Sequence, residues 1–126
     1  MSDPVGAIEA DLRIKLPPRH RAALLDASDP IHGRSILLGL DGDGGIPAVN
    51  RAERAADWRQ WPDHLVAFAY DGCGGLFAYD TRAEPYRVYY IDPMETVPES
   101  VAGCEAEGFV SPSFDAWYAE QLAGED

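Results

Sequence analysis

Basic residues are absent from the last part of this chain. From Val88 to Asp126 there are nine acidic residues and no lysine, arginine or histidine, whereas the whole chain has 10 Lys and Arg against 22 Asp and Glu. The formal net charge of -12 repels the phosphate backbone of nucleic acids, so DNA and RNA are poor candidates for a partner. A segment with acids and no bases would instead favour a basic partner.

Long apolar segments and a cysteine framework are also missing. No apolar run reaches the roughly 18 residues of a membrane-spanning helix, so we expect no membrane partner. The opening Met-Ser-Asp-Pro lacks the basic and apolar regions of a secretory signal, and we expect a cytoplasmic protein. Two cysteines, Cys73 and Cys104, are too few for a disulfide framework and are expected to be free thiols.

The common sequence patterns for cofactors and metal ions do not occur. There is no Rossmann glycine motif, P-loop or nucleophile elbow, and no cysteine and histidine spacing typical of zinc. Asp41-Gly42-Asp43 begins like a calcium-binding loop. However, Ile46 stands where that loop needs glycine and Ala52 where it needs glutamate, so a glycine-rich turn is favoured. We therefore expect neither a cofactor nor a resident metal ion.

One catalytic alternative is a small hydrolase that uses Cys73 together with His20, His32 or His64. A reactive thiolate needs a nearby cation or a helix N-terminus, and the glycines around Cys73 supply neither. A small residue in a tight turn explains Cys73 better, so we expect a protein that is not an enzyme.

The first half of the chain predicts three helices and a short strand. Apolar spacing predicts an amphipathic helix from Val5 to about residue 15, and good helix formers predict a second over 19–27, with Leu24 and Leu25 available to a core. Residues 35–40 predict a short strand.

A third helix is predicted over 51–60. Asn50 is followed three residues later by Glu53, which resembles a capping box at a helix N-terminus. Trp61-Pro62 would end this helix, and we expect most of the tryptophan and tyrosine side chains to be core or cross-strand packing.

The second half predicts a β-meander and a last helix. Aromatic-rich runs over 65–70, 75–80 and 86–91 predict three antiparallel strands, the first two joined by the Asp-Gly-Cys-Gly loop. An irregular acidic stretch then leads to a helix capped by Ser113. The sequence thus predicts one α+β domain over 1–126, with a largely antiparallel sheet flanked by N-terminal and C-terminal helices.

Four segments, in order, cover nearly the whole chain. They read LPPRHRAALL at 16–25, LVAFAYDGCGGLFAYD at 65–80, VYYIDP at 88–93 and SFDAW at 113–117. Together they resemble the SMI1/KNR4 (SUKH) superfamily. This resemblance implies an α+β domain without a known catalytic apparatus. Bacterial members are often immunity proteins that neutralise a cognate toxin, frequently a nuclease or a nucleic-acid deaminase, whereas yeast relatives regulate cell-wall synthesis.

The leading hypothesis is therefore a non-catalytic immunity protein that covers the active site of a basic toxin domain with an acidic surface. Strand alternation prevents Tyr89 and Tyr90 from both pointing inward, so at least one of them is either covered by a helix or available to a partner as an aromatic anchor. The expected partner-binding residues are Tyr89, Tyr90, Asp92, Glu95, Glu99, Glu105 and Glu107. The alternative is an intracellular regulatory or scaffold module that binds a host protein. The sequence specifies no oligomeric state.

Overall fold

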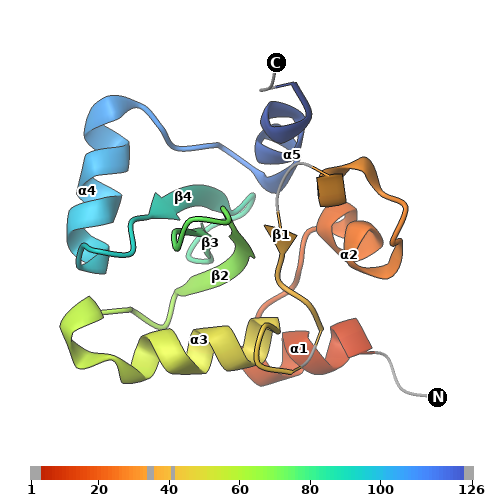
Figure 1. Ribbon diagram of the computed structural model, residues 1–126, viewed down its shortest axis with the longest axis horizontal. Helices are drawn as coiled ribbons and strands as arrows, with labels where there is room; N and C mark the ends of the chain where they lie inside the picture. Colours follow the sequence, from red (N-terminus) through yellow and green to blue (C-terminus); the bar gives the residue numbers. More distant parts are fainter. Residues whose placement is uncertain (1–3, 34–35, 41, 124–126) are drawn as a thin grey trace.

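The computed structural model describes residues 4–33, 36–40 and 42–123, and it confirms the α+β fold (Figure 1). The helices are α1 (Pro4–Leu12), α2 (Pro18–Leu25), α3 (Ile46–Ala55), α4 (Val97–Glu107) and α5 (Phe114–Ala123), with short 3-10 turns η1 (Pro30–Gly33) and η2 (Asp57–Arg59). The strands are β1 (Ile36–Leu37), β2 (Leu65–Tyr70), β3 (Leu76–Asp80) and β4 (Arg87–Ile91). They form one antiparallel sheet in the order β1-β2-β3-β4.

The predicted meander of three strands is confirmed within one residue at its ends. Its first loop depends on Asp71, whose carboxylate accepts the backbone N–H groups of Cys73 and Gly75. Gly72 and Gly74 both have positive φ, a backbone conformation that other residues rarely adopt. The Asp-Gly-Cys-Gly sequence therefore closes the β2–β3 loop by its local chemistry.

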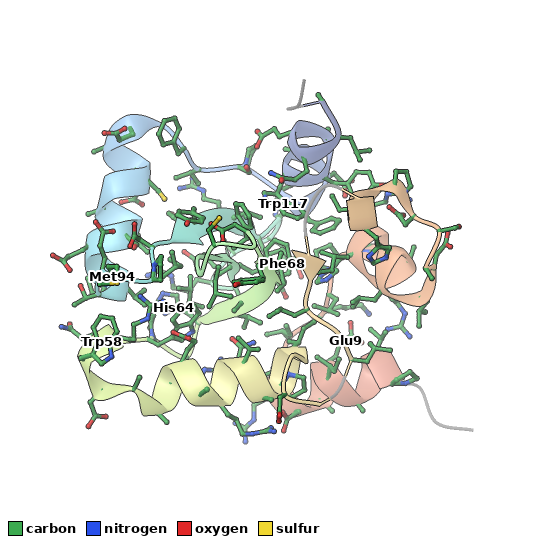
Figure 2. The ribbon with its side chains drawn as sticks, viewed as in Figure 1. Glu9, Trp58, His64, Phe68, Met94 and Trp117 are labelled. Carbon is green, nitrogen blue, oxygen red and sulfur yellow. The ribbon has the colours of Figure 1, made fainter. Side chains whose placement is uncertain are left out.

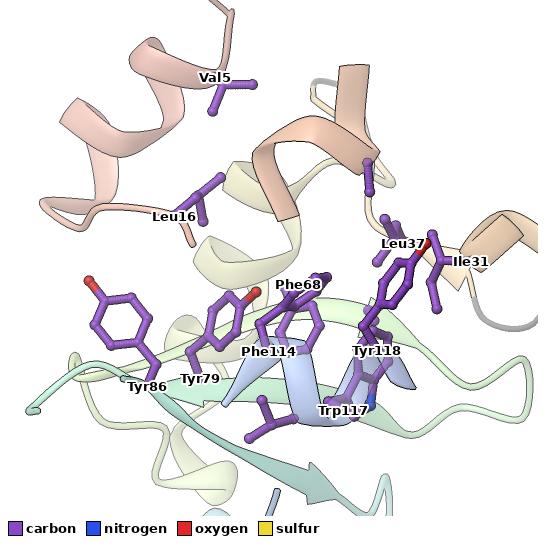
Figure 3. Close-up of a cluster of buried hydrophobic side chains, with 13 residues drawn as sticks. Val5, Leu16, Ile31, Leu37, Phe68, Tyr79, Tyr86, Phe114, Trp117 and Tyr118 are labelled. Carbon is purple, nitrogen blue, oxygen red and sulfur yellow. The ribbon is translucent and has the colours of Figure 1, made fainter. Parts of the chain in front are cut away.

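Helices pack on both faces of the sheet and bury two groups of side chains. α3 and α4 pack against β2 and β4, and the core on their side includes Leu65, Ala78, Tyr89 and Ile91. On the other face, residues of α5, α1 and α2, together with Leu16 between α1 and α2, pack around an aromatic cluster (Figure 3). Among the described residues, none of the helices has the length and apolar character needed to cross a lipid bilayer.

The aromatic cluster is built on stacked rings. Phe68 stacks on Tyr79 with ring centroids 4.1 Å apart, and the imidazole of His20 stacks on Phe114 at 4.9 Å. His20 is fully buried, and its Nδ1 lies 2.7 Å from the Tyr79 hydroxyl. Burial without an opposite charge lowers the pKa of His20 from 6.5 to about 3, so the imidazole is neutral in the folded protein.

The first two helices are shorter than predicted. α1 ends at Leu12 because Arg13 adopts a left-handed conformation with φ 59°, and Leu16 is buried from an extended segment instead. α2 ends at Leu25, which is 57% exposed, so the expectation that this residue faces the core was wrong. The buried residues of α2 are His20 and Ala23, which are one helical turn apart.

The capping box predicted at Asn50 was wrong. α3 begins at Ile46, with Gly45 as its N-cap and proline in its first turn, and Asn50 lies inside the helix. The buried Asn50 amide accepts the backbone N–H of Ala67 at 2.8 Å and donates to its carbonyl at 2.9 Å. Nearby, the Trp61 indole N–H donates to the Leu65 carbonyl. The presence of asparagine at position 50 is thus explained by its hydrogen bonds to Ala67 of β2 and not by helix capping.

The acidic stretch between the meander and the last helix was predicted to be irregular, and this was also wrong, because it forms α4. Thr96 caps the helix and makes a reciprocal capping box with Glu99, and Gly108 ends it with φ 76°. The last helix agrees with the prediction: α5 follows Ser113, whose hydroxyl accepts the backbone N–H of Ala116. The predicted strand over 35–40 is reduced to the two residues of β1, and Ser35 lies outside the described residues.

We predict that the free energy of unfolding falls as the pH drops from about 6.5 towards 3. In this window the unfolded chain binds a proton at His20 that the folded protein excludes, so acid favours unfolding by about 1.4 kcal/mol per pH unit from this group. Urea denaturation at pH 6.5, 5.5 and 4.5 measures the effect.

The control is the double variant His20→Phe/Tyr79→Phe, which removes both members of the buried polar pair. The stability of this variant should still decline with falling pH, because its carboxylates titrate. The decline should be less steep than in the wild type, because the contribution of His20 is gone. An identical pH dependence in the two proteins would show that His20 does not contribute.

Candidate functional site

Helix α4 carries most of the carboxylates that the sequence singled out. Val97, Ser100 and Cys104 turn inward, as helical spacing requires for one buried face. Glu99, Glu105 and Glu107 remain exposed. Residues two positions apart on a helix are about 200° apart around its axis, so Glu105 and Glu107 lie on opposite flanks. The structure therefore distributes these carboxylates around the exposed surface of α4 and does not gather them into one cluster.

The loop from β4 to α4 is held by a buried arginine. The guanidinium of Arg59, with a side chain 4% exposed, donates to the backbone carbonyls of Asp92 and Glu95 at 2.7 and 2.6 Å. It also pairs with Glu53 of α3 at 2.8 Å. Arg59 thereby fixes the start of α4 relative to α3, and its own charge is directed into the protein.

Asp92, Glu95 and Glu99 each have a structural contact as well as a surface position. Asp92 accepts the backbone N–H of Met94, Glu95 accepts the Ser100 hydroxyl at 2.8 Å, and Glu99 completes the capping box. These bonds order the carboxylates. Ordered charges lose less conformational entropy when they pair with a partner.

Tyr89 and Tyr90 lie on opposite faces of β4. Tyr89 is 2% exposed, and its hydroxyl donates to Glu105 of α4 at 3.1 Å. Tyr90 is half-buried, and its hydroxyl donates to Asp71 at 2.6 Å, a bond that raises the pKa of the tyrosine. A Cβ atom at Gly75 would lie 1.9 Å from the Tyr90 hydroxyl oxygen, so a larger residue there would displace the end of the Tyr90 side chain. Of the two tyrosines, Tyr90 keeps a partly accessible ring.

Three large apolar side chains near the ends of α4 are exposed, and the sequence did not identify them. Trp58 is 56% exposed and Met94 is 84% exposed near its N-terminal end, on the same side of the molecule (Figure 2). Phe109, directly after the Gly108 cap, is 69% exposed. The Thr96 to Glu99 capping box and Gly108 were signals for the ends of α4, but they do not indicate the exposure of the residues beside it.

The proposed catalytic alternative gains no geometric support. Cys73 is exposed in the β2–β3 loop, and its backbone N–H bonds to Asp71. His20 is buried against Tyr79, and the His32 ring bonds to the Ala23 carbonyl. Within the part of the chain that the structure describes, no three His, Cys, Asp or Glu side chains are arranged to hold a metal ion. Asp41 of the considered calcium loop lies outside the described residues.

These features define a small α+β domain in which α4 presents carboxylates and flanking apolar side chains to solvent. The chain belongs to the SMI1 / KNR4 family (SUKH-1), whose model matches residues 3–120. This family includes immunity proteins that bind toxins, and its domains are generally non-catalytic. No curated protein and no solved structure matched the chain significantly.

We predict that Arg59→Met lowers the free energy of unfolding by about 3 kcal/mol, because two carbonyls and Glu53 lose a buried charged donor. Hydrogen exchange should accelerate over residues 92–96. The matched control is Arg82→Met, which breaks an exposed pair with Asp80 and should leave the denaturation midpoint close to that of the wild type. Equal losses in the two variants would contradict the role of Arg59.

Proposed function

We propose that this protein is an immunity protein, acting in the cytoplasm, that binds and neutralises a basic, nucleic-acid-targeting toxin domain. Membership of the SMI1/KNR4 family supports the general class. The observation that carries the assignment is the surface of α4, where Glu99, Glu105 and Glu107 are exposed and the chain from Val88 onward contains no base.

The physical basis is replacement of one polyanion by another. A domain that acts on nucleic acid holds phosphates with cationic side chains, and protein carboxylates can pair with those same groups. The negative field around α4 also accelerates encounter with a positive surface and disfavours acidic partners. Binding at this surface would therefore block the toxin where its substrate binds.

Charge alone gives limited affinity, because exposed ion pairs are weak and are screened by salt. The exposed apolar side chains supply the complementary contribution. Trp58 and Met94 lie towards one end of α4 and Phe109 follows the other, and the helix between them is about 16 Å long. Large apolar side chains that become buried at the centre of an interface often account for most of its binding energy.

We predict that Glu107→Lys weakens binding to the toxin encoded by a neighbouring gene by about fivefold at low ionic strength. Glu107 is exposed at the end of α4, so its reversal changes the surface charge and leaves the core intact. The matched control is Asp43→Lys, which makes the same change in net charge at the exposed turn between β1 and α3. Calorimetry or surface plasmon resonance at low and high salt measures both.

The proposal requires Glu107→Lys to weaken binding more than Asp43→Lys does, and requires salt to reduce wild-type affinity. If affinity is insensitive to both, the acidic surface of α4 does not bind the partner. If no toxin is bound and a host protein is retained instead, the chain is a regulatory module and the immunity function is wrong.

A further inference from the structure

A hollow with a volume of about 530 Å³ opens between the end of α4, the outer part of β4 and α5. Its lining includes Phe77, Tyr90, Phe109, Trp117 and Glu120. The volume is within the range of pockets that hold small ligands or single side chains of a partner. Of these lining residues the proposed function uses only Phe109, as an exposed apolar contact, and it makes no use of the hollow itself.

Three aromatic rings follow one another along its wall. The ring of Phe77 meets that of Tyr90 at a centroid distance of 5.4 Å and that of Trp117 at 5.2 Å, with interplanar angles of 61° and 62°. Phe109 adds a fourth, largely exposed ring at the rim. Trp117 is only 2% exposed and its indole nitrogen is sealed from solvent, so the rings that a ligand can reach are those of Phe77, Tyr90 and Phe109.

The charge of the lining has one sign. Glu120 of α5 is the charged residue among those that line the hollow, and its carboxylate accepts the Ser111 hydroxyl at 2.8 Å. Asp71 does not line the hollow, but its carboxylate accepts the Tyr90 hydroxyl at 2.6 Å and so adds negative charge at the tip of that ring. Aromatic faces and carboxylates both attract a cation, and a cation over an aromatic ring gains more when water is excluded.

A second hollow, of about 410 Å³, has a different chemistry. It is lined by aromatic and proline side chains, and its lining includes Lys15 as well as Glu84 and Asp115. A lysine of the protein itself is thus available to those carboxylates. Among the described residues that line the hollow beside α5 there is no lysine or arginine, and the Glu120 carboxylate is exposed to a cation from outside.

We propose that the hollow beside α5 receives the guanidinium group of an arginine side chain from the protein partner. Arginine fits better than lysine because its planar group stacks on aromatic rings while its N–H groups reach a carboxylate. That the partner is a toxin rests on the proposed function. The recognition of arginine rests on the lining residues alone.

The test is an NMR titration of the full chain with N-acetyl-arginine-N-methylamide. We expect a dissociation constant of about 1 mM, with amide shifts centred on residues 109–111 and 120–121. The norleucine analogue, which has a similar stem but no charge, should not produce these shifts. Equal binding of norleucine, or arginine shifts located elsewhere, would overturn the proposal, and equal binding of the lysine analogue would overturn its preference for guanidinium.

Two variants of exposed residues test the lining without disturbing the core. Phe109→Ala removes a ring, and Glu120→Gln removes a charge but keeps an oxygen for Ser111; each should weaken arginine binding by about threefold or more. The controls are Leu25→Ala, an exposed apolar residue on α2, and Asp43→Asn in the exposed turn between β1 and α3, which should both bind as the wild type does. Unchanged binding in Phe109→Ala and Glu120→Gln would refute the site.

The same variants separate this inference from the proposed function. If the toxin binds and Glu120→Gln, which leaves the exposed Phe109 in place, lowers its affinity by about threefold, the hollow accepts a side chain of the toxin. If the toxin binds with unchanged affinity, the inference fails and the proposed function stands. If arginine binds the hollow but no toxin binds the protein, the immunity function fails and the arginine site stands.

Discussion

The guanidinium of Arg59 is the contact on which the candidate surface depends. It joins η2 and α3 to the loop before α4, because it binds Glu53 and two backbone carbonyls at once. Satisfying these groups stabilises the start of α4 and also removes a positive charge from the neighbouring surface. Arg59 therefore orders the start of α4. Because its guanidinium is buried, it also does not compete for the exposed carboxylates of that helix.

The meander and the last helix could be predicted from sequence because their signals are local. The aromatic-rich apolar runs, the Asp-Gly-Cys-Gly loop and the Ser113 cap each indicate their own local structure. Asn50 misled the prediction since asparagine is typical of helix N-termini, whereas here its amide serves a strand 17 residues away. Such a tertiary hydrogen bond has no counterpart in the periodicity of the chain.

The candidate site was identified in part. The sequence named the carboxylates because their charge is visible without coordinates, but it missed α4, where proline and glycine at residues 98 and 103 suggested an irregular segment. Proline is compatible with the first turn of a helix, and packing on β4 offsets the cost of a glycine. The exposure of Trp58, Met94 and Phe109 depends on how the helix docks, which no local pattern encodes.

The hydrogen bonds of Asn50 and Trp61 have a further consequence for the way this protein meets others. β1 is only two residues long, and beyond it the Asn50 amide and the Trp61 indole occupy backbone groups of Ala67 and Leu65 along the border of β2. An open strand border is a template on which a foreign chain can extend a sheet or start an aggregate. Side chains close that template here, so strand addition along this border of β2 is disfavoured.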